Sequence, residues 1–181
     1  MGDRLAMNAD AIGRAVARMA REIVERAGRD AGELAVVGIR RGGVHLAERL
    51  RGEIARATGT RPPLGTLDIA LYRDDLAERG RAPVLGPTDI PFPVQGRTIV
   101  LVDDVLYTGR TVRAALDELV DFGRPRRVWL AVLVDRGGRE LPIAADFAGA
   151  TVPAAEGEDV LVRLVEGGAA EDVVVVRRRG S

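Results

Sequence analysis

The sequence predicts an α/β protein in which a central parallel β-sheet is flanked by helices and carries a small hood lobe. Up to Asp135, short apolar runs alternate with stretches of helical spacing, an order typical of parallel sheets covered on both faces. Beyond Asp135 the pattern changes to short β-prone pieces at 160–165 and 173–176, separated by glycine-rich turns. A chain of 181 residues with 46% hydrophobic content supports one good core without requiring a second domain.

The first half of the chain predicts a helix, a strand, a second helix and a second strand. The first helix is capped by Asn8 or Asp10 and ends near Gly28, because its apolar positions recur at helical spacing. The apolar run 34–38 predicts a strand, and the loop RRGG after it leads into a helix that reaches past Leu50. A further strand is expected around 67–71.

The second half begins with a polar, proline-containing stretch at 72–95, which predicts a long loop. Loops of that length are usually functional or disordered, so residues 73–95 are expected to form a flexible loop. A strand at 97–102, a helix at 110–122 and a strand at 127–134 follow. We therefore expect one domain over 1–181, with a core at about 8–135 and the hood at about 136–179.

Composition excludes several kinds of protein. The 27 basic and 27 acidic residues balance, so there is no global positive field of the kind that nonspecific nucleic-acid binders carry. The absence of cysteine excludes disulfides and thiolate metal sites. The N-terminal stretch carries Asp3 and Asp10 without an apolar core, and no apolar run approaches ~20 residues. We expect a cytoplasmic protein with no membrane segment.

The stretch VDDVLYTGRT (102–111) combines two adjacent acids with a tight turn between a strand and a helix. Backbone N–H groups from Thr108 to Thr111 can converge on an anion at the positive end of that helix, and Gly109 permits a close approach. The spacing matches neither of the common glycine-rich nucleotide motifs. Asp103 and Asp104 suit the hydroxyls of a ribose 5-phosphate or a hydrated Mg²⁺. The structural alternative is an acid pair that only caps the helix at the edge of the sheet.

The surrounding residues resemble a known family over nearly the whole chain, from about Ala11 to the last strand. The stretches LDIALYRDDL (67–76), VLVDDVLYTGRTVRAALDELVDFGRPRR (100–127) and LAVLVDRGGRELPIAADFAG (130–149) are similar to those of the PyrR family. Its members are type I phosphoribosyltransferases that regulate the pyrimidine operon and act on uracil. The resemblance implies transfer of ribose 5-phosphate from phosphoribosyl pyrophosphate to uracil, giving UMP and pyrophosphate with Mg²⁺.

The same resemblance assigns roles to individual residues. The catalytic pair, which also holds Mg²⁺ directly or through water or ribose hydroxyls, is Asp103 and Asp104. The ribose 5-phosphate loop comprises Val105, Leu106, Tyr107, Thr108, Gly109, Arg110 and Thr111. The pyrophosphate residues are Arg40, Arg41, Gly42, Gly43 and Arg73, and the base hood contains Asp135, Arg136 and Val152. As alternatives, loop arginines are often only solvated charges, and His45, inside a helical pattern, is expected to be structural rather than a general base.

Two departures from the family pattern bear on function. The loop RRGG replaces the usual T-R-G and is closer to some purine phosphoribosyltransferases, so a purine base is an alternative substrate. Relatives that bind RNA carry hydroxyl, imidazole or cationic side chains at positions matched here by Ala17, Arg21, Gly138, Ala144 and Ala150. Because phosphate contacts dominate RNA affinity, we expect weak RNA binding. A UMP-responsive RNA-binding attenuator of the pyrimidine operon remains the alternative function, and a homodimer or higher homo-oligomer is expected.

Overall fold

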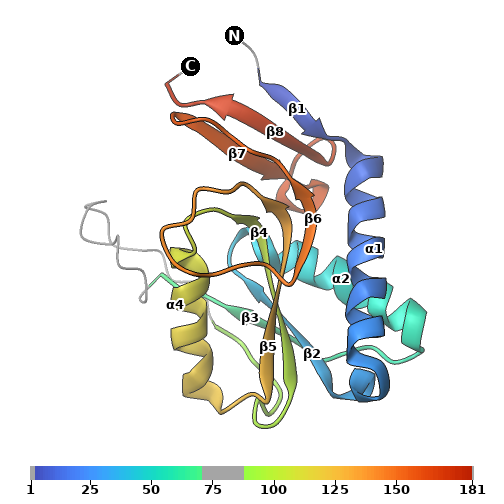
Figure 1. Cartoon of the computed structure of the whole chain (residues 1–181). Coiled ribbons are helices and arrows are strands. Elements are labelled where there is room, and N and C mark those ends of the chain that lie inside the picture. Colours follow the sequence, from blue (N-terminus) through green and yellow to red (C-terminus); the bar gives the residue numbers. More distant parts are fainter. Residues whose placement is uncertain (1–2, 71–87, 181) are drawn as a thin grey trace.

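The computed structural model describes residues 3–70 and 88–180, and its core is a five-stranded, wholly parallel sheet (Figure 1). The strand order is β3-β2-β4-β5-β6, with β4 in the centre. The strands are β2 (Leu34–Ile39), β3 (Leu64–Leu67), β4 (Thr98–Leu106), β5 (Arg127–Asp135) and β6 (Phe147–Thr151). The β2 strand is buried throughout, as expected of a parallel strand that is covered on both faces.

Helices cover both faces of this sheet (Figure 1). Two of them, α1 (Ala9–Ala27) and α2 (Gly42–Thr58), pack on one face, and α4 (Arg110–Leu119) packs on the other. Alternate residues of β2 face opposite cores: Val36 lies with α1 and α2, and Val37 lies with α4. The described residues also contain three short 3₁₀ turns, η1 (Gly28–Glu33), η2 (Val120–Phe122) and η3 (Val165–Gly167). Among the described helices, none combines the length and the apolar character needed to cross a bilayer.

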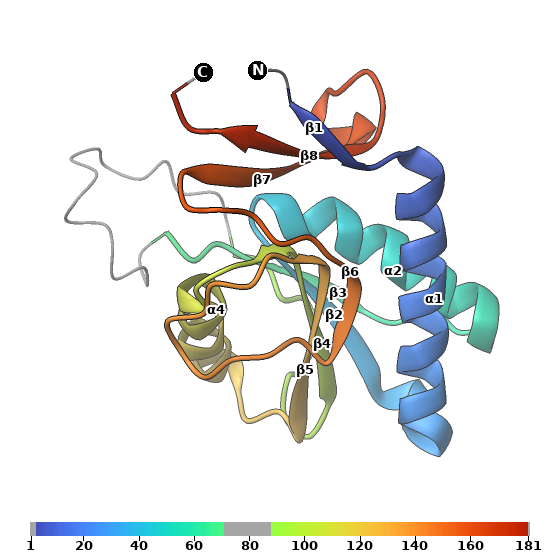
Figure 2. The ribbon, with the colours of Figure 1, turned by 45° about the horizontal axis from the view of Figure 1, so that its top comes forward.

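A second, smaller sheet joins the two ends of the chain. It is antiparallel, in the order β1-β8-β7, and consists of β1 (Arg4–Met7), β8 (Val173–Arg178) and β7 (Glu158–Arg163). Both views place it beyond the carboxyl ends of the parallel strands (Figures 1 and 2). A lobe above this edge of the main sheet is what the sequence predicts for the hood.

The order of the parallel strands locates a crevice. The chain runs from β2 outward to β3, then returns to β4 on the other side of β2 and continues outward through β5 and β6. In an open α/β sheet, ligands bind beyond the carboxyl ends of the strands where the winding reverses. Here that point lies between β2, which precedes the RRGG loop, and β4, which carries the paired acids.

The predicted fold class is confirmed, with several differences in the individual elements. The strand expected at 67–71 is instead β3 at Leu64–Leu67, because it starts directly after Pro63 and pairs in parallel with β2 from Val36 onward. The strand expected to end at Val102 continues to Leu106, since β5 pairs with β4 along that whole length. Neither β1 nor β6 was expected from the sequence. Of the expected loop at 73–95, residues 73–87 lie outside the described part of the chain.

Candidate active site

Three chain segments leave adjacent parallel strands at the same edge of the sheet. The β2 loop (40–43) leads into α2, the β4 loop (107–111) leads into α4, and the post-β5 segment (136–146) leads to β6. The strand order therefore brings together residues that are up to about a hundred positions apart in sequence. Most predicted site residues, including Arg40 and Thr108, fall on these three segments, while Arg73 lies outside the described residues.

The acid pair lies within the last part of β4. Asp103 is only 6% exposed, and its Oδ1 accepts a hydrogen bond of 2.9 Å from the N–H of Asp104. Asp104 is half-buried, and its own Oδ1 accepts from the N–H of Val105 at 2.8 Å. Backbone donors thus satisfy one oxygen of each carboxyl group at the end of a buried strand, where desolvation alone is costly.

The β2 loop packs directly against the acid pair through its glycines. A β-carbon on Gly42 would lie 2.1 Å from Oδ2 of Asp104, and one on Gly43 would lie 2.2 Å from the carbonyl oxygen of Val102. Real β-carbons do not approach other atoms so closely, so Gly43, which faces backbone, requires glycine, and a side chain at Gly42 would displace the Asp104 carboxylate. The contact fixes the Asp104 carboxylate at the start of α2. The preceding Arg40–Arg41 peptide bond is cis, Arg40 is half-buried and Arg41 is exposed.

The helices that begin at these two loops lack side-chain caps. Asn8 caps α1 by accepting a 2.9 Å hydrogen bond from the N–H of Ala11, and Asp10 places an acid in the first turn of that helix. In contrast, α2 and α4 begin without a capping side chain and without an acidic residue in the first turn. Their N-terminal dipoles are therefore available to anions at the same edge of the sheet.

The β4 loop has the backbone geometry of an anion cradle. Gly109 adopts φ +93°, a left-handed conformation that residues with a side chain rarely take. A β-carbon at this position would lie 3.4 Å from the β-carbons of Leu141 and Ile143, so these two side chains cover Gly109. The hydroxyl of Thr108 accepts from the N–H of Arg110 at 3.3 Å. Tyr107 is 41% exposed, so its ring forms part of the rim of the site.

The three predicted hood residues lie at and beyond the end of β5. Burial raises the pKa of the Asp135 carboxyl, but hydrogen bonds from Arg139 and from the N–H of Gly137 outweigh it and leave that pKa below its ordinary value. Arg136 is buried, stacks on the ring of Tyr107 with 3.6 Å to its centroid, and donates to the carbonyl of Glu158 in β7. Val152 is buried, and its N–H donates to the carbonyl of Asp135.

These donors do not form a complete metal cage. Among the described residues, no three histidine, cysteine or acidic side chains are placed to hold one ion. Two adjacent carboxylates nevertheless fit Mg²⁺, which usually takes one or two protein carboxylates and fills its other positions with water and substrate oxygens. Any Mg²⁺ at Asp103 and Asp104 would therefore be shared with a ligand.

Comparison with known proteins identifies the family. Residues 7–158 match the model of the phosphoribosyl transferase domain. The chain is 56% identical over 180 residues to the bifunctional protein PyrR of Roseiflexus sp., covering 98% of this chain and 97% of the relative. It is 54% identical to the bifunctional protein PyrR of Thermus thermophilus, covering 97% and 96% of the two chains. The chain belongs to the PyrR family of phosphoribosyltransferases.

Solved structures agree on the fold. The hypoxanthine phosphoribosyltransferase of Trypanosoma cruzi superposes with a TM-score of 0.72 over 97% of each chain. Its sequence identity is only 17%, so this similarity concerns architecture and not the base. The type I phosphoribosyltransferase fold implied by the sequence is thereby confirmed.

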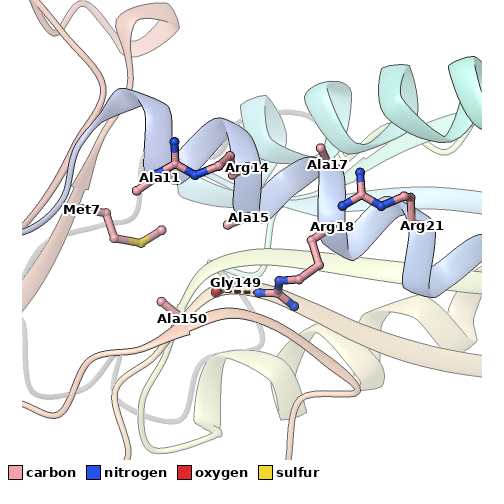
Figure 3. A pocket seen from close by; sticks show the side chains of 9 residues that line it. All are labelled: Met7, Ala11, Arg14, Ala15, Ala17, Arg18, Arg21, Gly149 and Ala150. Carbon is pink, nitrogen blue, oxygen red and sulfur yellow. Dashed lines mark hydrogen bonds between the residues drawn. The ribbon is translucent and has the colours of Figure 1, made fainter.

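Three of the five positions at which we expect this chain to differ from RNA-binding relatives lie together, whereas Gly138 and the exposed Ala144 lie in the post-β5 segment. Ala17, Arg21 and Ala150 line one groove of about 540 Å³ between α1 and β6, together with Met7, Ala11, Arg14, Ala15, Arg18 and Gly149 (Figure 3). Gly138 is not among the lining residues. It lies beside the Tyr107 ring, where a β-carbon would approach Cε2 to 2.5 Å.

The contacts of two residues, Arg139 and Glu118, were not predicted from the sequence. Arg139 bonds to Asp135 and Ile143, which lie four residues away on either side, but its contact with Tyr107, 32 residues earlier, depends on the folded chain. Glu118 of α4 is buried and accepts a hydrogen bond from the hydroxyl of Thr88, a residue 30 positions away. Neither contact follows a local spacing rule, so sequence periodicity does not find them.

Proposed function

We propose that this protein is a cytoplasmic uracil phosphoribosyltransferase that forms UMP and pyrophosphate from uracil and phosphoribosyl pyrophosphate. The observation that carries the proposal is the position of the acid pair. Asp103 and Asp104 lie where the winding of the sheet reverses, between two uncapped helix N-termini that suit two separate anionic groups. Phosphoribosyl pyrophosphate has such groups, a 5′-phosphate and a pyrophosphate, on either side of a ribose.

The reaction breaks the bond between ribose C1 and a pyrophosphate oxygen and forms a bond between C1 and N1 of uracil, whose N1 proton is released. Positive charge develops on the ribose, and the carboxylates of Asp103 and Asp104 stabilise it. The β4 loop binds the 5′-phosphate, a group remote from C1, and this binding helps to position C1 for the reaction. Arg40, Arg41 and the N-terminus of α2 bind the departing pyrophosphate.

Mg²⁺ is part of the proposal because the acid pair offers it two oxygens beside the expected position of the ribose hydroxyls. When bound, it would supply charge neutralisation for the pyrophosphate. The roles of Asp103 and Asp104 in binding and orienting the ribose do not depend on its exact position.

Uracil is the proposed base because the chain belongs to the PyrR family, and Asp135, Arg136 and Val152 are the residues we assign to the base hood. A purine base is the competing substrate, since RRGG at 40–43 resembles the loop of purine enzymes.

The test compares bases directly. Purified protein is incubated with Mg²⁺, phosphoribosyl pyrophosphate and uracil, hypoxanthine or guanine, and kcat/KM is measured from nucleotide formation. We expect uracil to give the highest value. A clear preference for hypoxanthine or guanine would overturn the choice of base while leaving the reaction type in place.

RNA-binding regulation is the second candidate function, and the groove between α1 and β6 is the observation that favours it. Arg14 and Arg21 are exposed along its rim and, among the described residues, have no hydrogen-bond or ion-pair partner. Arg18 instead reaches across to the carbonyls of Ala148 and Gly149 (Figure 3). In a homodimer, two such helices would bring their arginines together into one basic surface. Ala17 and Ala150, however, offer no side-chain donor.

We therefore expect RNA binding to be weak and governed by charge. The protein is titrated with its own pyrimidine-operon leader RNA across a salt series, with and without UMP. Micromolar binding that disappears by about 200 mM salt is the expected result. Nanomolar, sequence-selective binding that UMP strengthens would instead establish the regulatory function, and loss of that binding in the Arg14→Ala/Arg21→Ala double variant would assign it to the groove.

A further inference from the structure

Three successive carbonyl groups, from the last residue of β4 into the loop after it, are held by the post-β5 segment. The carbonyl of Leu106 accepts from the N–H of Arg136 at 3.0 Å, and that of Tyr107 accepts from Nη1 of Arg139 at 2.9 Å. The carbonyl of Thr108 accepts from the N–H groups of Glu140 and Leu141 at 3.0 and 3.1 Å. Three successive carbonyls thus face the same neighbouring segment.

This arrangement sets the direction of the loop amides. In a trans peptide unit, the carbonyl of one residue and the N–H of the next are coplanar and point in opposite directions. Holding the carbonyls of Leu106, Tyr107 and Thr108 against the post-β5 segment therefore turns the following N–H groups away from it. These N–H groups precede the uncapped N-terminus of α4, where the 5′-phosphate is proposed to bind.

Within residues 3–70 and 88–180, Arg139 is the one side chain among the groups that hold these carbonyls. Arg139 donates from Nη1 to Tyr107, from Nε to the carbonyl of Ile143 at 2.8 Å, and from Nη2 to Oδ2 of Asp135 at 2.6 Å. The three acceptors belong to the β4 loop, the post-β5 segment and the end of β5. A planar guanidinium serves three acceptors in fixed directions, whereas a lysine ammonium cannot reproduce that fork.

The carboxylate of Asp135 is itself fixed, because its Oδ1 accepts from the N–H of Gly137 at 2.9 Å. The Arg139 side chain is 23% exposed, and its bonds to Asp135 and Ile143 are partly buried, so solvent competes poorly for these two, whereas its bond to the Tyr107 carbonyl is exposed. The guanidinium is thus held by two anchors, Asp135 and Ile143, and presents its remaining donor to Tyr107.

We propose that Arg139 is a positioning residue that orients the β4 loop for binding of a sugar 5′-phosphate. It acts through the carbonyl of Tyr107 and does not touch the substrate. The inference rests on the proposed function, which places the 5′-phosphate in this loop. It gives the post-β5 segment a second role besides covering the base.

Arg49 provides a matched control for Arg139. It lies in α2, its side chain is 24% exposed, and its guanidinium also joins separate segments by binding Glu166 and Asp172. Its hydrogen bonds within the described part of the chain go to Glu166 and Asp172 and not to the β4 loop. Arg49→Lys and Arg139→Lys therefore remove comparable bonding patterns, of which only the second supports the loop.

The test measures binding of ribose 5-phosphate by calorimetry to wild type, Arg139→Lys and Arg49→Lys, well below the melting temperature of each. We expect Arg139→Lys to weaken binding about tenfold, the scale of one charge-assisted hydrogen bond, and Arg49→Lys to leave it unchanged even if both lower Tm. In turnover assays, the KM for phosphoribosyl pyrophosphate should rise more than the KM for uracil.

Unchanged ribose 5-phosphate affinity in Arg139→Lys overturns the inference, as does a wild type that does not bind this ligand. Should Arg139→Lys fail to fold, Asp135→Asn provides the test, because it weakens one anchor of the guanidinium. This variant should lower the affinity for ribose 5-phosphate by a smaller factor. An unchanged affinity would again overturn the inference. Because ribose 5-phosphate carries no base, the proposed function can fail separately, through a wild type that forms no UMP.

Discussion

The β2 loop and the β4 loop lie side by side at one edge of the sheet, and different physical means hold them in place. The β4 loop is held by hydrogen bonds to its carbonyls at Tyr107 and Thr108. The β2 loop is held by close packing, since Gly42 and Gly43 leave no room for a β-carbon. The first loop is therefore sensitive to loss of a bonding partner, and the second is sensitive to gain of a single methyl group.

The largest effect is expected where the two loops meet, at the acid pair. Asp103→Asn or Asp104→Asn should lower kcat/KM by about 10²–10³, the scale measured when one preorganised electrostatic group is removed. The fold should persist, because removing one of two neighbouring carboxylates relieves repulsion. Steady-state kinetics and thermal unfolding measure the two consequences separately.

Asp117→Asn is the control for this experiment, since Asp117 lies on the outer side of α4 in an exposed pair with Arg113. Near-normal turnover in both acid-pair variants would show that Asp103 and Asp104 do not bind the ribose.

The packing of the β2 loop predicts a smaller effect that differs between its two glycines. Gly43→Ala meets the backbone carbonyl of Val102, which cannot move aside, so stability should fall by about 1–3 kcal/mol. Gly42→Ala meets the Asp104 carboxylate, a side chain that can rotate, so activity should fall more than stability. Denaturant unfolding and kcat/KM on both variants measure this difference.

Gly52→Ala supplies the matched control, because Gly52 lies in the same helix, α2, with no atom near the added methyl. Alanine there should stabilise the protein by about 0.5–1 kcal/mol. If Gly43→Ala were as stable as Gly52→Ala, the β2 loop would not be held by packing.

The smallest effect concerns α4, the helix that follows the β4 loop. Burial raises the pKa of the Glu118 carboxyl, a hydrogen bond from Thr88 opposes this, and the charges of Asp68 and Asp121 add to the increase. The folded protein therefore binds this proton more readily than the unfolded chain, and stability falls as pH rises from the ordinary pKa of 4.5 through the raised value. Glu118→Gln should remove that part of the pH dependence.

Urea unfolding at intervals between about pH 4 and pH 7.5 follows the difference in unfolding free energy between Glu118→Gln and wild type. The Glu118→Gln variant should gain unfolding free energy relative to wild type as pH rises. The exposed Glu25→Gln variant serves as the control for loss of a surface charge. A difference that stays constant with pH would show that Glu118 has the same pKa in the folded and unfolded states.

The comparison of the two loops also shows which features the sequence could predict. The stretch 102–111 is a local pattern of strand, acids, turn and helix, and the structure retains that order, although the strand extends through the acids to Leu106. The glycines at 42 and 43 suggest a tight loop, but their contacts with Asp104 and Val102 depend on β2 and β4 being neighbours. Local patterns can thus be predicted from the sequence, whereas contacts between residues on different strands cannot.

A related cause explains why β1 and β6 were not predicted from the sequence. The β6 strand reads FAGAT, and its alanine and glycine residues have weak β propensity, so only pairing with β5 makes it a strand. The four residues of β1, RLAM, form a strand only because β8 lies beside them. Arg139 is a similar case, since its partner Tyr107 lies 32 residues earlier.

The pairing of β1 with β8 has a consequence for synthesis in the cell. Arg4 lies opposite Val176, and Asp3 forms ion pairs with Arg163 and Arg177. A ribosome adds residues from the N-terminus, so β1 is made before all the strands of the parallel sheet, whereas its partner β8 is made after them. The parallel sheet can begin to assemble during translation, but the small sheet can close only after it. Contacts between such distant parts of a chain also form slowly, because the loop between them must close first.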